Sequence, residues 1–502
     1  MVINIKFLTE KEREQIGFNY IMAKLQVITP YGKEEMKNVK PFKREEKEKV
    51  IKEYDYIELM RGSLEKDKEL FYKILKILFK IKDIRNSVKK CKTGEILDEV
   101  ELYEIKIFCL LSEELRTFIE RLKIDIEDIM LKSVKPILDL LDPQKKRIAT
   151  FHIYDEYSQR LKEIREKKRE IERQIFLETE KEKIEKLKEK RLEIVVLEQH
   201  EELEVKKKIS KELFSYISIL EANIKAIGRF DFLMAKTKLS MEYGGIKPKI
   251  NEDLEINFTN VINPQVSDIL KAQGKKFTPI SLKIKNGTTV ITGANMGGKT
   301  VALKTITLNL LLGIMGFFVF AEEASFPIVD FIHFVSEDLQ SVSRGLSSFG
   351  AEVIKLKEII EDVKKGSGFI ALDEIARGTN PEEGLYIVKA ISKYLNSFPS
   401  ITVLATHYDG VVEENMIHYQ VVGLKNVDFE MLKQKISMNR SNSIEILQEY
   451  MDYNLERVDS FYEVPKDALN ICRILGLEEE VIELAEKYYE KEVKTVKIGS
   501  KK

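Results

Sequence analysis

Cysteine is scarce in this chain of 502 residues, which holds three: Cys91, Cys109 and Cys472. Their number is odd and they lie far apart, which argues against a disulfide scaffold and against a cysteine-rich zinc site. The five histidines show no metal-ligand spacing either. These shortages indicate a reducing compartment, and we expect a cytoplasmic protein.

An excess of either charge is also missing, since 83 basic and 84 acidic residues give a formal net charge of -1. No global basic field points to nucleic acid, so any DNA contact would have to be local. The apolar run Ile306–Phe320 is too short for a membrane span and contains Asn309 and Gly313, so we expect a buried helix that runs into a strand. The N-terminus lacks a basic segment followed by an apolar signal core. We therefore expect no membrane partner.

The first third of the chain has a helical pattern. From Glu10 to about Leu141, apolar residues recur at spacings of three and four, with charged residues between them. The clearest stripe predicts a core-facing helix between Ile96 and Leu122. Its members are Val100, Tyr103, Ile107, Leu111 and Leu115.

Residues from about Glu156 to Lys211 form the most charged segment, and their apolar positions lie on a narrow seam. The seam comprises Leu161, Ile164, Ile171, Ile175, Ile184, Leu187 and Ile194. Such spacing favours a long antiparallel helical arm, a coiled coil with charged outer faces. Lys206–Lys208 could contact phosphate, but three lysines are ordinary on a charged helix. Strand character is confined to Glu193–Leu197.

From about Ile250, short apolar runs alternate with helical patterns, which predicts an α/β sheet with crossover helices. The expected fold is an α/β domain with a mixed sheet and flanking helices, preceded by an all-α core with long lever helices and the arm. The expected divisions are a helical core at 1–150, the arm at 151–245, the α/β domain at 246–425, and a helical tail with a disordered end at 426–502.

The stretch Gly293–Thr300 satisfies the phosphate-loop pattern G-x-x-x-x-G-K-[ST]. It lies between a β-branched run, Thr288–Thr292, and a helical pattern that begins at Val301. Backbone N–H groups of such a loop face inward at a helix N-terminus and bind anions. Lys299 can reach the β and γ phosphates of a nucleotide, and the Thr300 hydroxyl can ligate Mg²⁺.

Two further strand ends carry polar side chains. Phe369–Glu374 is a buried-strand run that ends in two carboxylates, where Asp373 would hold Mg²⁺ and Glu374 would orient or deprotonate the attacking water. Ile401–Ala405 is followed closely by His407, which can hydrogen-bond a γ-phosphate and sense the nucleotide state. Taken singly, the acidic pair is also compatible with a surface turn and the histidine with a structural role.

The order of these motifs resembles the ATPase domain of the MutS family over about residues 255–410. The segments that carry the resemblance are Thr292–Thr300, Asp373–Thr379 and Ala405–His407. The resemblance implies ATP and Mg²⁺ as ligands, with the phosphate loop contributing Gly293, Asn295, Met296, Gly297, Gly298, Lys299 and Thr300. It implies Lys299, Glu374 and His407 as the catalytic residues. Ala294 departs from the proline usual in the family, which should alter loop stiffness more than chemistry.

The resemblance also implies a homodimer with two composite sites. Residues 338–349, with Glu352, match the family's signature segment, in which a serine reaches the γ-phosphate bound in the partner. That role falls to Ser347, with Ser348 as the neighbour that could substitute. Gly378–Pro381 matches the loop that crosses the dimer interface, and Phe277 is similar in position to the aromatic that stacks on adenine.

Outside the ATPase region the resemblance is weaker and takes in the helical core and the levers. It also takes in the tail, where Ile471–Leu477 followed by Val481–Ala485 is similar to the family's C-terminal helical dimer element. The mismatch-reading domain of the repair members is expected to be missing, and the DNA clamp at the arm's tip to be reduced. Two functions remain open. One is a MutS-type ATPase whose arms open and close around mismatched or branched DNA. The other is an ATP-dependent reactivase of an adenosylcobalamin-dependent (B12) lysine or ornithine aminomutase, because this outline is similar to the short MutS-like proteins associated with those enzymes.

Overall fold

The computed structural model describes residues 7–293, 298–336, 348–425, 427–438, 443–458 and 467–488. Contacts within the chain group its residues into two units. Unit 1 comprises Met1–Leu25, Lys40–Asp55 and Leu239–Lys502, and unit 2 comprises Gln26–Val39 and Tyr56–Lys238. The helical region expected at 1–150 thus contributes two segments to the unit that contains the sheets. Within the described ranges, no helix combines the length and the apolar content that a membrane span requires.

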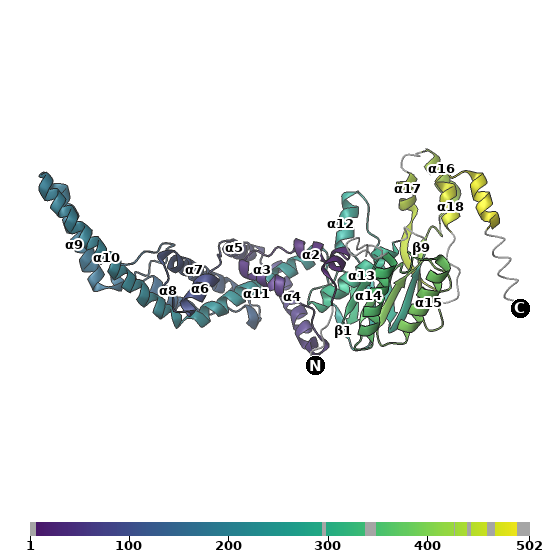
Figure 1. Ribbon diagram of the computed structural model, residues 1–502, viewed down its shortest axis with the longest axis horizontal. Helices are drawn as coiled ribbons and strands as arrows, with labels where there is room; N and C mark the ends of the chain where they lie inside the picture. Colours follow the sequence, from purple (N-terminus) through teal and green to yellow (C-terminus); the bar gives the residue numbers. More distant parts are fainter. Residues whose placement is uncertain are drawn as a thin grey trace. The chain divides into compact units, whose positions relative to one another are not determined.

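Unit 2 is built from helices. Its elements are α3 (Pro30–Asn38), α5 (Lys68–Leu78), α6 (Arg85–Lys92), α7 (Glu99–Leu122), η2 (Glu127–Ile129), α8 (Lys135–Leu141), η3 (Asp155–Tyr157), α9 (Gln159–Leu177) and α10 (Lys181–Phe214), with parts of α4 (Lys47–Lys66) and α11 (Ile217–Glu242). Helices α9 and α10 run antiparallel, side by side (Figure 1), and ion pairs join Arg165 to Glu198 and Arg191 to Glu172. The strand expected at Glu193–Leu197 was wrong, because the segment lies inside α10, whose flanking lysines, glutamates and leucines favour helix.

Helix α7 occupies the predicted place but turns a different face to the core. Val100, at the start of the predicted stripe, is 65% exposed. The buried residues are Leu102, Ile105, Lys106, Phe108, Cys109, Ser112, Leu115, Ile119 and Leu122. Lys106 enters the core because its Nζ lies 3.2 Å from Asp142 Oδ1 and donates to Thr150 O at 2.8 Å. A prediction made from apolar residues alone places a lysine on the surface, so it misses a lysine that is buried because its charge is paired.

Unit 1 contains two sheets. The six-stranded sheet has the order β10 (Asp452–Arg457), β9 (Ile417–Gly423), β4 (Gly287–Thr292), β8 (Ile401–Ala405), β7 (Phe369–Asp373) and β6 (Ile332–Val335). Its strands are parallel except β10, which is antiparallel to β9. The four-stranded sheet has the order β1 (Lys249–Asn251), β5 (Glu323–Pro327), β2 (Glu255–Val261) and β3 (Ile280–Lys285). The three strands predicted from apolar runs are confirmed as β4, β7 and β8.

The helices of unit 1 lie before, between and after the strands of the two sheets. They are α1 (Glu10–Gln15), α2 (Phe18–Lys24), η1 (Arg44–Glu46), α12 (Pro264–Ala272), α13 (Lys299–Ile314), α14 (Ser348–Val363), α15 (Pro381–Asn396), α16 (Phe429–Met438), α17 (Ser443–Tyr450) and α18 (Asp467–Ile474). The apolar run from Ile306 is the buried second half of α13, followed by a bridge between Val319 and Ile246 and then by β5. This confirms a buried helix that leads into extended chain.

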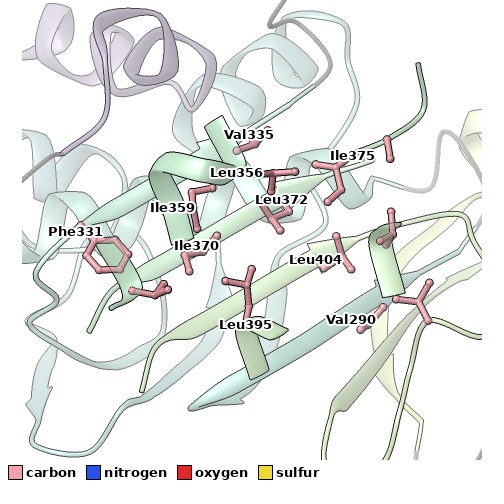
Figure 2. Packing of buried hydrophobic residues seen from close by; sticks show 14 residues of the cluster. Val290, Phe331, Val335, Leu356, Ile359, Ile370, Leu372, Ile375, Leu395 and Leu404 are labelled. Carbon is pink, nitrogen blue, oxygen red and sulfur yellow. The ribbon is translucent and has the colours of Figure 1, made fainter. Parts of the chain in front are cut away.

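Helices α14 and α15 cover one face of the six-stranded sheet. Leu356 and Ile359 of α14 and Leu395 of α15 pack against Val290, Ile370 and Leu404 of three neighbouring strands (Figure 2). The alternate strand residues, such as Ala371 and Val403, are also buried and face the other side, where α13 contacts β7 and β8. This burial on both faces holds the carboxyl ends of the strands in a fixed register.

Candidate active site

The carboxyl ends of β4, β7 and β8 meet at one edge of the six-stranded sheet. Ile291 of β4 and Asp373 of β7 both pair with Ala405 of β8. The backbone N–H of Glu374 continues this ladder by donating to Ala405 O at 3.0 Å. Because the strands are parallel, the residues that follow each of them lie along the same edge. The phosphate loop, the acidic pair and His407 are therefore brought together.

The ends of the phosphate loop pack against the hairpin of β9 and β10. Gly293 has φ 138° and Gly298, the N-cap of α13, has φ 84°, a region that favours glycine. A Cβ on Gly293 would lie 2.9 Å from Val421 Cβ, and one on Gly298 would lie 3.1 Å from Tyr453 Cδ1. Both glycines are thus required by backbone conformation and by close packing.

Lys299 begins α13 and is buried, with a side chain 4% exposed. Its Nζ donates to Gly293 O at 2.8 Å and lies 3.4 Å from Glu374 Oε1. Burial lowers the pKa of Lys299, while the charges of Glu374 and Asp373 act in the opposite direction. The ammonium group therefore connects the phosphate loop to the acidic strand end.

Asp373 and Thr300 form the part of the site that suits a divalent cation. The Thr300 side chain hydrogen-bonds the Asp373 carboxylate, and burial raises the pKa of Asp373 to about 6. Asp373 Oδ1 is buried and has no hydrogen-bond partner among the described residues. Those residues contain no cluster of three or more His, Cys, Asp or Glu that could hold a metal. One carboxylate and one hydroxyl fit Mg²⁺, which keeps several waters and is shared with substrate phosphates.

Glu374 lies in a tight turn directly after β7. Its φ is 47° and that of Ala376 is 62°, both in the left-handed region that non-glycine residues rarely adopt. Arg377 Nη1 lies 3.2 Å from Glu374 Oε2, and His407 Nδ1 lies 3.9 Å from the same oxygen. The backbone N–H of Ala376 donates to Glu352 Oε2 at 2.8 Å in a buried position. Glu352 thus supports the turn that carries Glu374.

The other predicted site residues lie in neighbouring segments of unit 1 or outside the residues that the structure describes. Phe277 lies half-buried in the segment between α12 and β3, and its contact with adenine stays a prediction. Asn295, Met296, Gly297 and Ser347 lie outside the residues that the structure describes. Gly378–Pro381 leads into α15, with Asn380 as its N-cap. Tyr453 was missed, although the alternation of Tyr453, Leu455 and Arg457 is a weak strand signal.

Comparisons with known proteins point to the same part of the chain. Residues 289–490 match the family model described as MutS domain V. The chain is 28% identical to an Endonuclease MutS2 of Caldanaerobacter subterraneus subsp. tengcongensis, over 88% of this chain and 60% of that protein. It is 30% identical to an Endonuclease MutS2 of Caldicellulosiruptor bescii, over 65% of this chain and 48% of that protein. A DNA mismatch repair protein MutS of Alkaliphilus metalliredigens is 31% identical over 46% of this chain and 26% of that protein.

Each of these matches spans less than two thirds of the relative's own length. The region that matches MutS domain V begins in β4 and includes the phosphate loop, the acidic pair and His407. The strand ends that the sheet brings together thus lie inside the region that matches the family model. On this evidence residues 289–490 resemble domain V of the MutS family, and the chain is similar to MutS2 proteins over much of its length.

Proposed function

We propose that this chain is an ATP hydrolase that couples turnover of Mg·ATP to movement of its helical unit on DNA. The observation that carries the proposal is the meeting of Lys299, Asp373 and Glu374 at one edge of the sheet, where Lys299 and Asp373 are buried. Burying a cation and carboxylates costs free energy unless the charges pair with one another or bind a ligand, and such groups often mark functional sites. Enzymes that transfer phosphoryl groups use a lysine that binds phosphate, an aspartate that holds Mg²⁺ and a residue that positions the attacking group.

Each residue has a defined part in the proposed reaction. Lys299 binds the β and γ phosphates, and Thr300 and Asp373 hold Mg²⁺, which neutralises phosphate charge when bound. Lys299 Nζ lies 3.4 Å from Glu374 Oε1. Phosphates that draw Lys299 away would leave the Glu374 carboxylate available to orient or deprotonate the attacking water. His407, close to the same carboxylate, is positioned to sense the γ-phosphate.

The proposed active unit is a homodimer with two composite sites. Ser347 would reach the partner's γ-phosphate, and the exposed loop Gly378–Pro381 would lie beside it. The C-terminal helix at 479–488 supports dimerisation, because Val481, Leu484 and Tyr488 are exposed at spacings of three and four. An apolar stripe of this kind on a surface helix suits pairing with a second helix.

DNA is the proposed ligand of the dimer. The relatives named above are a DNA mismatch repair protein and endonucleases, and they give the aminomutase reactivase no support. With a net charge of -1, the chain would contact DNA locally, mainly through phosphates, and would select shape rather than sequence. The paired helices α9 and α10 would be the arms that open and close. The activity that we propose for this chain is ATP hydrolysis, without the endonuclease activity that the relatives' names mention.

Steady-state hydrolysis of Mg·ATP tests the catalytic part. Glu374→Gln should bind ATP and lose turnover by about a hundredfold or more, since it removes the group that handles the water. Lys299→Ala should lose nucleotide affinity instead. Lys393→Met, an exposed lysine at the end of α15, is the matched control and should behave as wild type. Equal turnover in wild type and Glu374→Gln would refute the catalytic assignment.

Binding to mismatched, branched and plain duplexes across a salt series tests the ligand. Contacts to phosphate should give affinity that falls steeply with ionic strength, with a preference for branched or mismatched duplexes if shape is read. Absence of binding even at low ionic strength would remove DNA as the partner.

A further inference from the structure

A buried ion pair ties the short N-terminal helix α1 to α14. Lys355 Nζ of α14 lies 2.8 Å from Glu12 Oε1, and Glu12 is 3% exposed. The other carboxylate oxygen, Glu12 Oε2, accepts a hydrogen bond from Thr9 N at 2.7 Å and so completes the capping box of α1. Lys355 Nζ also lies 3.7 Å from Glu358 Oε2, in a more exposed position. Both oxygens of Glu12 are therefore committed, one of them to Lys355.

Helix α14 also carries the support of the Glu374 turn. Glu352 lies one helical turn before Lys355, is buried, and accepts the hydrogen bond from Ala376 N. Ala376 and Glu374 both have positive φ, so the turn persists only if its surroundings hold it. Helix α14 therefore carries both Lys355, which is paired with Glu12, and Glu352, which supports the turn that bears Glu374.

We propose that Glu12 and Lys355 are positioning residues for ATP hydrolysis, an inference that rests on the proposed function of Glu374. The ion pair fixes α14 and occupies the Lys355 ammonium. Without the Glu12 charge, that ammonium is left in a mostly buried place with Glu352 and Glu358 as the carboxylates one turn away on its own helix. Loss of either partner leaves α14 no longer held at Glu12, so Glu352 shifts relative to Ala376 N and the turn loses its support.

The expected effect is on turnover rather than on nucleotide binding. Small displacements of a catalytic group cost about tenfold to hundredfold in rate. Lys299 and Thr300, which would bind the nucleotide, lie on α13 and not on α14. Loss of the ion pair should therefore lower kcat and leave the KM for ATP unchanged within about twofold.

Four variants and one control test the proposal. Glu12→Gln removes the charge but keeps an acceptor for the capping box, and Lys355→Met removes the ammonium at similar length. Each should lower kcat by about tenfold or more, and the double variant should lose no more than either single one, because both remove the same interaction. Lys355→Arg keeps the charge and should retain turnover. Lys357→Met, an exposed lysine of the same helix, should match wild type.

A second readout does not require activity. Amide hydrogen exchange over residues 374–378 of the nucleotide-free protein should be faster in Glu12→Gln than in Lys357→Met. Wild-type kcat together with unchanged exchange in Glu12→Gln would overturn the inference, as would losses confined to KM. Failure of the proposed function looks different, because wild type would then lack turnover or Glu374→Gln would match it, whatever the exchange data show.

Discussion

Protonation of Asp373 should set the acidic limit of Mg·ATP binding. The residue is 6% exposed, and burial raises its pKa from 3.8 to about 6. That shift corresponds to about 3 kcal/mol for ionising this carboxyl in its buried place rather than in water. Above pH 6 the carboxylate is ionised and can ligate the cation; as the pH falls through 6 it takes up a proton and the affinity is lost. At pH 5 about one site in eleven is ionised, so affinity should be about tenfold lower than at pH 8.

Titration calorimetry of Mg·ATP with the Glu374→Gln variant measures this effect without hydrolysis. ATP itself takes up a proton in the same pH range, so the matched control is the same protein with Asp373→Asn added. The control should bind more weakly at pH 8 and show only the pH dependence of the ligand. Near pH 6 the parent should release more protons on binding than the control, seen as a larger dependence of the enthalpy on the buffer. Identical pH profiles for the two proteins would refute the assignment of Asp373.

Two further predictions concern packing. Gly298→Ala places a Cβ at φ 84° and 3.1 Å from Tyr453, so it should cost about 1–2 kcal/mol of local stability and weaken nucleotide binding. Adding Tyr453→Ala should recover part of the loss, and full recovery would show that backbone strain plays no part. Lys106→Met leaves Asp142 buried without its cation, and amide exchange in α7 should report a loss of about 3–5 kcal/mol. The double variant Lys106→Met/Asp142→Asn should lose less, and an equal loss would contradict the pairing.

Sequence patterns located the strand ends of the candidate site because local signals specify them. The β-branched run before Gly293 and the apolar runs before Asp373 and His407 are short, buried strands, and parallel strands place their ends at one edge. The phosphate-loop pattern added the order of strand, turn and helix. These signals cannot supply the fine arrangement of the side chains, such as the 3.4 Å distance between Lys299 Nζ and Glu374 Oε1.

Contacts between distant segments were not predictable. Lys106 is buried because it pairs with Asp142, and Glu12 pairs with Lys355, which is far from it in the sequence. Neither ion pair can be recognised from the spacing of apolar residues. Tyr453 lies in a strand whose alternation is weak, and its contact with Gly298 depends on the antiparallel hairpin of β9 and β10. In each case tertiary partners, not local propensity, decide where a polar or aromatic side chain lies.

Sedimentation velocity of the Glu374→Gln variant with and without Mg·ATP tests the central claim most directly. If two chains enclose ATP at composite sites, the nucleotide should drive the protein to twice the 58.3 kDa mass of one chain, because hydrolysis no longer reopens the dimer. Adding Lys299→Ala should abolish the nucleotide effect. A single-chain mass at every ATP concentration would contradict the account.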